Sequence, residues 1–301
     1  MKRIFIVSAT LLLSLFAFTH CNHENGEDNG GNNNNPCAVM DADGNCYDTV
    51  HIGNQVWMKS NLRTTHFRDG SEIPFANSMN ATGSWYYKPA NTDFTNYNSE
   101  IYGCYYSEKA VHDARGLCPA GWHVPTFSEW DELGKYVSTH YENYFNFVHN
   151  YGQDYFEEFE ENMEDVFYEW EDEDYTYPYF YFWDDLPIAK AIASKTGWLL
   201  YWDDESVVVS DEEVMAPAIH PEYNNSTGFS AYPAGLCIFD NDNNAPYYMY
   251  GGRITGLWSS TKLEGDLNEC SYFCELFLNL GGIRPYYADN SYGLSVRCVK
   301  D

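Results

Sequence analysis

Nine cysteines are the residues with the clearest chemistry in this 301-residue chain. If the chain is exported, and Cys21 is set apart, an even number of cysteines remains, which predicts disulfide bonds. Cys37 and Cys46 flank a turn at residues 41–45 and are expected to pair with each other. Six further cysteines allow fifteen connectivities, among which spacing alone does not choose. They are Cys104, Cys118, Cys237, Cys270, Cys274 and Cys298.

Oxygen-bearing side chains crowd residues 240–244, where Asp240, Asp242 and Asn244 are spaced as three calcium ligands could be. The string lacks the glycine and the bidentate glutamate of a calcium loop, so a solvated loop is the competing interpretation. Residues 41–45, Asp-Ala-Asp-Gly-Asn, also resemble the start of a calcium loop, but no glutamate stands at its twelfth position. A turn is preferred there, and calcium is the one cofactor for which the sequence offers candidate ligands.

Composition and motifs disfavour several other functional classes. The chain has nine histidines and many serines, but it lacks the G-x-S-x-G elbow of a serine hydrolase. It carries 45 acidic and 16 basic residues, a formal net charge of −29, and no basic stripe. Because such a chain repels phosphate backbones, we expect no nucleic acid partner.

Residues 1–20 are typical of a secretory signal peptide, since Lys2 and Arg3 precede an apolar run that is too short to span a membrane. Cys21 stands where a lipoprotein signal places its lipidation cysteine, although His20 occupies a position that usually holds a small residue. Residues 21–36 are too polar to bury a core and predict a disordered tether. We expect a protein of the cell envelope, at the outer membrane or cell surface, that meets the membrane through its N-terminal lipid.

The strongest local fold signals lie in residues 118–133, C-P-A-G-W-H-V-P-T-F-S-E-W-D-E-L. Thr126 and Glu129 match the S/T-x-x-E capping box, which predicts that a helix begins after Thr126. Apolar residues then recur every three or four positions and predict a buried stripe. The stripe consists of Trp130, Leu133, Tyr136 and Val137.

Strand patterns occur on both sides of this helix. Residues 47–63 alternate around a Gly-Asn step and predict a hairpin, whereas residues 64–104 are expected to form loops with short strands. Short alternating blocks predict strands at 228–235, 256–261 and 293–298, and residues 190–199 are expected to form a strand or turn. Together these patterns predict an α+β domain over residues 37–301, with mostly antiparallel strands.

An acidic, aromatic segment at about 140–186 differs from the rest of the domain. Fourteen acidic residues lie between positions 154 and 185, and eighteen aromatic residues lie between 141 and 183. Aromatic and aliphatic residues recur at helical spacing, which predicts an acidic amphipathic helix. Its carboxylates either form a solvated face or offer a docking surface for a cationic partner or divalent ions.

Several blocks resemble, in order, the Fibrobacter succinogenes major paralogous domain, a family of exported bacterial proteins. They are I-G-N-Q-V-W-M-K-S-N-L, C-P-A-G-W-H-V-P-T-x-x-E-W, S-K-T-G-W, G-F-S-A-x-P-A-G, W-S-S-T and G-L-S-V-R-C-V-K-D. The resemblance covers about residues 47–301, and the acidic segment is then an insertion. It implies a C-type-lectin-like fold in which the first and last strands pair and a disulfide joins Cys118 to Cys298.

The resemblance supplies a fold and a location but no enzymatic activity. We therefore expect a non-enzymatic binding or adhesion module with an unidentified extracellular ligand, either a glycan or a protein. The E-P-N or Q-P-D and W-N-D triplets with which related lectins hold calcium do not occur in the chain.

The alternative is an oxidase, because Cys270 and Cys274 lie about where formylglycine-generating enzymes carry a cysteine pair. Their spacing is one residue short, and the flanking G-G-S-W and R-Y-R elements are missing. In a strand, Cys274 would instead face inward with leucines at 276, 278 and 280 and bridge to Cys237 or Cys104.

Overall fold

The computed structural model describes residues 37–76, 83–89, 98–140, 188–199, 216–240 and 245–301. The expected signal peptide, Cys21, the tether and residues 141–187 of the predicted insertion lie outside these ranges. The described residues all belong to one unit, Cys37–Asp301. Within them, no helix has the length and apolarity needed to cross a membrane.

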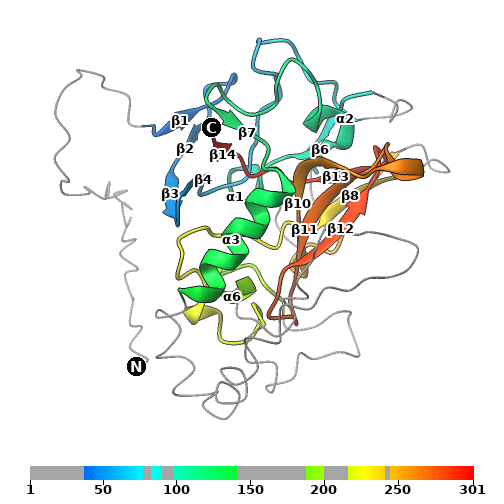
Figure 1. The fold of residues 1–301 in the computed structure, drawn as a ribbon. Helices are drawn as coiled ribbons and strands as arrows, with labels where there is room; N and C mark the ends of the chain where they lie inside the picture. The colour runs from blue at the N-terminus through cyan, green and yellow to red at the C-terminus, as the bar shows by residue number, and fades with distance from the viewer. Residues whose placement is uncertain (1–36, 77–82, 90–97, 141–187, 200–215, 241–244) are drawn as a thin grey trace, which may run out of the picture. The chain divides into compact units, whose positions relative to one another are not determined.

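The described chain has an α+β fold dominated by short antiparallel strands, as the sequence predicts (Figure 1). The strands are β1 Val39–Met40, β2 Cys46–Tyr47, β3 Thr49–Ile52, β4 Gln55–Met58, β5 Tyr86–Tyr87, β6 Tyr105–Ser107, β7 Trp122–His123, β8 Leu236–Asp240, β9 Ala245–Met249, β10 Ile254–Lys262, β11 Ser271–Phe277, β12 Arg284–Ala288, β13 Tyr292–Leu294 and β14 Val299–Lys300. The helices are α1 Ser99–Tyr102, α2 Glu108–Val111, α3 Phe127–Thr139 and α6 Ile188–Ile192, with 3-10 turns η3 Pro221–Tyr223 and η4 Gly265–Leu267.

Early and late parts of the domain meet in a four-stranded sheet of order β3-β4-β14-β7 (Figure 1). The predicted hairpin supplies β3 and β4, and Gly53 in their turn has a left-handed φ of 60°. In the last strand, Val299 pairs with Trp57 of β4 on one side and with His123 of β7 on the other. The family resemblance implies that the first and last strands pair; the last strand pairs instead with β4 and β7, whereas β1 pairs with β2.

Helix α3 begins where the capping box predicts. The hydroxyl of Thr126 accepts a hydrogen bond from the backbone N–H of Glu129 (3.3 Å), and the Glu129 carboxylate accepts one from the N–H of Thr126 (2.7 Å). In the stripe, Trp130, Leu133 and Val137 are buried and Tyr136 is partly buried. The ring of Trp130 lies 4.7 Å from that of Trp57 on the hairpin. Full burial of each large apolar side chain stabilises the fold by about 1.5–3 kcal/mol, so the stripe fixes α3 to the first sheet.

Two further sheets enclose a second core cluster, with orders β5-β6-β13-β8-β9 and β10-β11-β12. They meet where Ser295, directly after β13, forms a parallel bridge with Leu257 of β10, and a Cβ added at Gly256 would lie 2.9 Å from Leu294. The indole of Trp258 on β10 also donates to the carbonyl of Tyr106 on β6 (2.7 Å). Strand β10, at one end of its sheet, therefore contacts β6 and β13 of the other sheet, and β9 and β12 are end strands as well.

Residues 228–235 form a loop rather than the predicted strand, and β8 begins only at Leu236. Ser230 has a left-handed φ of 58°, which interrupts any extended run. The carbonyls of Phe229 and Ser230 accept hydrogen bonds from Arg297 instead of from a neighbouring strand. The predicted strand at 293–298 is shorter as well, since β13 ends at Leu294.

Residues 188–192 form helix α6, so the prediction of a strand or turn from residue 190 onward is wrong for its first residues. All five side chains of α6 are buried. A helix that is buried on every side has no polar face, and its sequence therefore shows no helical period.

Arg297 joins the hairpin to the loop at 228–235 from a fully buried position. Its Nη1 donates to the carbonyl of Met58 (3.1 Å), its Nη2 donates to Oδ1 of Asn61 (2.8 Å), and its guanidinium lies 4.4 Å from the ring centroid of Phe229. Burial lowers the pKa of Arg297 to about 9. The hydrogen bonds go to neutral oxygens, so this arginine holds backbone segments together and is unavailable to a ligand.

Candidate functional site

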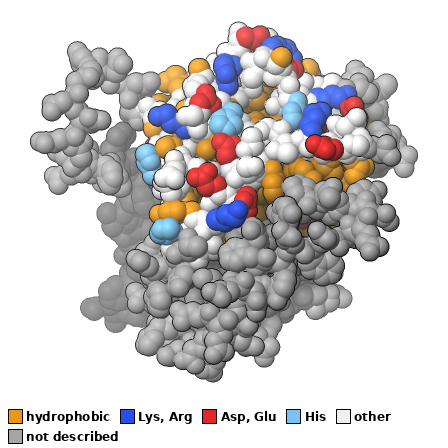
Figure 2. Space-filling view, in the orientation of Figure 1, with side chains coloured by type: hydrophobic (Ala, Val, Ile, Leu, Met, Phe, Trp, Pro, Cys, Tyr) orange, Lys and Arg blue, Asp and Glu red, His pale blue; other side chains and the backbone are white. Residues whose placement is uncertain are grey.

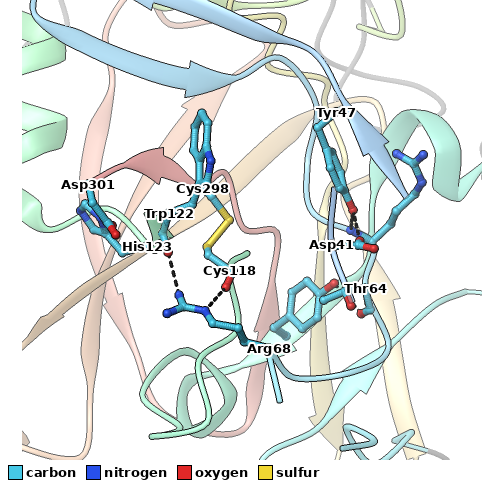
Figure 3. Close-up of a disulfide and its surroundings, with 11 residues drawn as sticks. Asp41, Tyr47, Thr64, Arg68, Cys118, Trp122, His123, Cys298 and Asp301 are labelled. Carbon is cyan, nitrogen blue, oxygen red and sulfur yellow. Dashed lines mark hydrogen bonds and ion pairs between the residues drawn. A yellow bond between two sulfur atoms is a disulfide. The ribbon is translucent and has the colours of Figure 1, made fainter. Parts of the chain in front are cut away.

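A disulfide joins Cys118 to Cys298 across a sequence separation of 180 residues, with the two Cα atoms 6.1 Å apart (Figure 3). This is the bridge that the family resemblance implies. Arg68 supports the segment before β7, since its Nε donates to the carbonyl of Cys118 (2.9 Å) and its Nη2 to that of Trp122 (2.8 Å). The region is therefore a structural clasp between the turn before α3 and the end of the chain.

His123 extends this clasp to the C-terminal residue (Figure 3). Its Nδ1 lies 2.7 Å from Oδ1 of Asp301, and its Nε2 lies 2.9 Å from Oε1 of Glu129. Glu129 is already the capping residue of α3, so the histidine couples the helix start to the chain end. Because both ring nitrogens are engaged, the geometry favours a structural role for His123 over proton transfer.

The second disulfide joins Cys37 to Cys46, as the local spacing predicts. In the turn between them, the carboxylate of Asp41 accepts from the backbone N–H of Asn45 (2.9 Å) and from the hydroxyl of Tyr47 (2.5 Å). The backbone N–H of Gly44 also donates to the carbonyl of Asp41 (3.1 Å). The structure therefore confirms the predicted turn at residues 41–45.

Cys104, Cys237, Cys270 and Cys274 are free thiols in the structure. The expectation that all eight domain cysteines form disulfides is therefore wrong for these four, including the proposed bridge from Cys274 to Cys237 or Cys104. Burial raises the pKa of Cys104 to about 12 and that of Cys237 well above its usual range. Three of the four are buried, and buried structural thiols of this kind are inert.

The geometry of Cys270 and Cys274 does not favour a redox pair. Cys274 is buried among the residues under α3, whereas Cys270 packs beside Leu263 and Tyr272 in a separate cluster. Burial raises the pKa of both thiols, and that of Cys274 strongly. Reactive cysteines have lowered pKa values and an electropositive, accessible setting, which this strand does not provide.

A buried polar cluster around Glu108 on α2 resembles a catalytic arrangement in composition. Oε1 of Glu108 lies 3.0 Å from both Lys262 Nζ and Ser271 Oγ, and Ser271 Oγ lies 2.7 Å from Nε2 of His112. In a hydrolytic triad the serine and the carboxylate contact different nitrogens of the histidine ring. Here Oε1 of Glu108 lies 3.3 Å from Nε2 of His112, the same nitrogen that Ser271 contacts. Glu108 and Ser271 are fully buried, so the cluster ties α2 to β10 and β11.

The predicted calcium ligands are only partly placed by the structure. Asp240 is the last residue of β8, whereas Asp242 and Asn244 lie outside the described residues. Among the residues that the structure describes, no group of three or more histidine, cysteine, aspartate or glutamate side chains is arranged to hold a metal ion.

The arrangement best suited to contact a ligand is one that the sequence analysis missed. We call it the tyrosine face, and it consists of Tyr247, Glu275, Arg284, Tyr286 and Tyr292. Tyr247 on β9 and Tyr286 on β12 are 59% and 58% exposed, the highest values among the large apolar side chains described. Figure 2 shows the face of the molecule over α3, where apolar side chains lie among acidic, basic and histidine side chains.

Cross-strand register assembles the tyrosine face. Glu275 of β11 pairs with Arg284 of β12, and two residues along the same strands Phe273 pairs with Tyr286. On the other sheet, Tyr292 of β13 pairs with Ile238, which pairs in turn with Tyr247. Paired residues share a face of the sheet, so each row presents its side chains together.

Glu275 is a partly buried carboxyl group at the centre of this arrangement. Burial raises its pKa to about 7, against the opposing effect of the nearby positive charge on Arg284. The pKa of Tyr292 is raised by burial and by neighbouring groups that include Tyr286 and Glu275. The effect of Tyr286 and Glu275 on Tyr292 indicates that β11 and β12 of one sheet bring these two side chains near Tyr292 of the other sheet.

A family model of the Fibrobacter succinogenes major domain matches residues 50–300. No curated protein and no solved structure matches the chain. The matched range contains the clasp at Cys118 and Cys298, the Glu108 cluster and the tyrosine face.

Proposed function

The chain belongs to the Fibrobacter succinogenes major domain family, and from that premise we propose that it is a non-enzymatic binding or adhesion module of the cell surface. The observation that carries the proposal is the tyrosine face. Large aromatic side chains that stay exposed on edge strands, beside a carboxyl group and a guanidinium, are typical of surfaces that contact a partner.

The covalent organisation supports an extracellular location. The domain is disulfide-bonded at both ends, and disulfides persist in oxidising compartments. The proposal includes export by the signal at residues 1–20 and lipid attachment at Cys21, with residues 21–36 as the tether. Intact mass of protein extracted from membranes tests the anchor, and a mature chain that begins elsewhere would contradict it.

The proposed architecture is C-type-lectin-like, with the bridge from Cys118 to Cys298 and the pairing of β4 with β14 as support. Calcium is a proposed cofactor only at Asp240, Asp242 and Asn244. The tyrosine face offers a single carboxylate, whereas calcium takes about six to eight oxygen ligands. We therefore propose that binding at this face does not depend on calcium.

The test is an array of glycans and extracellular protein fragments probed with the purified full chain, with and without calcium. We expect a specific set of ligands whose signal falls when Tyr247 and Tyr286 are both changed to Ser. The matched control is Tyr223→Ser, because Tyr223 is 37% exposed on η3, outside the tyrosine face. Absence of any saturable binding to either ligand class would contradict the proposal.

A further inference from the structure

The tyrosine face combines exposed aromatic rings with polar groups to which the described residues provide no hydrogen-bond or ion-pair partner. In the part of the chain that the structure describes, the Glu275 carboxylate forms neither a hydrogen bond nor an ion pair. The same holds for the hydroxyls of Tyr247, Tyr286 and Tyr292 within those ranges. Most partly buried polar side chains find a protein partner, so a carboxyl group left without one is available to a ligand.

The rings form two platforms. Tyr286 lies almost parallel to Tyr287, with an interplanar angle of 10° and centroids 5.6 Å apart. Tyr292 and Tyr247 are separated by one strand, which places their backbones roughly 10 Å apart. Two platforms with hydrogen-bonding groups between them suit a ligand of several units, each of which has an apolar face and a polar rim.

We propose that the tyrosine face binds a neutral oligosaccharide, with pyranose rings against Tyr286 and Tyr247 and sugar hydroxyls donating to Glu275. Arg284 supplies donors for sugar oxygens from the neighbouring strand. It is the cross-strand neighbour of Glu275, and its guanidinium lies 5.6 Å from the ring centroid of Phe277. The inference rests on the proposed binding function and assigns to it a site and a ligand class.

Charge argues for a neutral ligand over an acidic one. The chain carries a formal net charge of −29, and Glu275 would lie against any acidic group placed on the same platform. A ligand held only by apolar contacts would leave the Glu275 carboxylate desolvated without a partner, which is unfavourable. A sugar provides the apolar surface and the hydroxyl donors together.

The experiment measures binding of neutral glucose, xylose and mannose oligosaccharides, and of glucuronic-acid-containing counterparts, to the purified full chain by calorimetry. We expect a neutral oligosaccharide to bind and Glu275→Gln to weaken it at least tenfold, since a hydrogen bond to a charged group is worth about this factor or more. Tyr286→Ser should weaken it to a similar degree. The matched controls are Glu264→Gln and Tyr223→Ser, which change exposed residues outside the face and should leave the affinity unchanged.

Each outcome separates this inference from the proposed function. Oligosaccharide binding that survives both Glu275→Gln and Tyr286→Ser overturns the site, and preference for the acidic oligosaccharides overturns the ligand class. If the chain binds protein fragments but no oligosaccharide, the inference is wrong while the binding function stands. If it binds neither class, both fail. Circular dichroism of each variant establishes that the fold is retained, and Glu275→Gln is isosteric, which keeps it informative if Tyr286→Ser misfolds.

Discussion

Replacing Glu275 with Gln should make the domain more stable at alkaline pH and reduce the dependence of its stability on pH. Burial raises the pKa of Glu275 to about 7 from an ordinary value of 4.5. A carboxyl group whose pKa is raised on folding favours the folded state at low pH, and this contribution is lost as pH rises from 4.5 through 7. The groups that face it are Arg284 on β12, which opposes the shift, and Tyr292 on β13, which is neutral throughout this range.

The magnitude follows from the size of the shift. Each pKa unit corresponds to 1.36 kcal/mol, so the difference between pH 4.5 and 8 is about 3 kcal/mol at most, and partial solvent access reduces it to an expected 1–3 kcal/mol. Gln keeps the shape of the side chain and carries no charge. The variant should therefore exceed the wild-type free energy of unfolding by about this amount at pH 8.5 and match it below roughly pH 4, where the carboxyl group is protonated in both states.

Urea unfolding followed by tryptophan fluorescence at several pH values measures this difference. Other groups titrate in the same range, so the informative quantity is the difference between the two proteins at each pH. Glu264→Gln serves as the control, because Glu264 is exposed and its loss should leave the pH profile unchanged. If Glu275→Gln and wild type show parallel profiles from pH 5 to 8.5, Glu275 is solvated in the folded protein and the geometry of the tyrosine face is wrong.

Four further predictions concern the scaffold. Changing Cys118 and Cys298 together to Ala should lower the free energy of unfolding by up to about 5 kcal/mol, because the bridge closes a loop of 180 residues; equal urea midpoints for variant and wild type would contradict this. Arg297→Met should lower the free energy of unfolding by on the order of 3–5 kcal/mol, since it leaves buried carbonyls of Met58 and Phe229 unpaired. In the same assay, Arg297→Lys should recover little of this loss. Cys274 should resist a thiol-reactive dye in the native protein and react after unfolding, and rapid native labelling at this residue, read by peptide mass, would show an accessible thiol. Replacing residues 141–185 with a short Gly-Ser linker should preserve a cooperative melting transition, because lengthening a loop adds only about 0.6 kcal/mol per doubling; loss of cooperativity would place the aromatic residues of that segment in the main core.

Local signals in the sequence predict the parts of the fold in which the determining residues are neighbours in the chain. The capping box of Thr126 and Glu129 is such a case, since both partners lie within one helical turn. The Gly-Asn step between β3 and β4 is another. The disulfide between Cys118 and Cys298 is different, because its partners are 180 residues apart and only the family resemblance implied it.

Predictions failed where the backbone takes its hydrogen bonds from distant side chains. The segment at 228–235 has a strand-like composition, but the carbonyls of Phe229 and Ser230 accept hydrogen bonds from Arg297. No pattern in the neighbouring sequence predicts that contact. The four free thiols also depend on the positions of residues that are distant in the sequence. An even number of cysteines predicts disulfides only on average, whereas each bridge requires two Cβ atoms about 3.5–4.5 Å apart.

The position of the tyrosine face depends on the register of β11, and the sequence predicts only which residues of this strand face the core. Cys274 and Leu276 face the core, as the strand alternation predicted, and both are buried. Alternation then requires that Glu275 point to the opposite side, and the pairing with β12 places Arg284 and Tyr286 on that side too. A slip of one residue would place Glu275 in the core beneath α3 and remove Cys274 and Leu276 from it, so burial of these two side chains fixes the side of the strand on which Glu275 lies. The position of the candidate ligand-binding group is therefore a consequence of core packing, although the strand that brings it together with Tyr292 comes from another sheet.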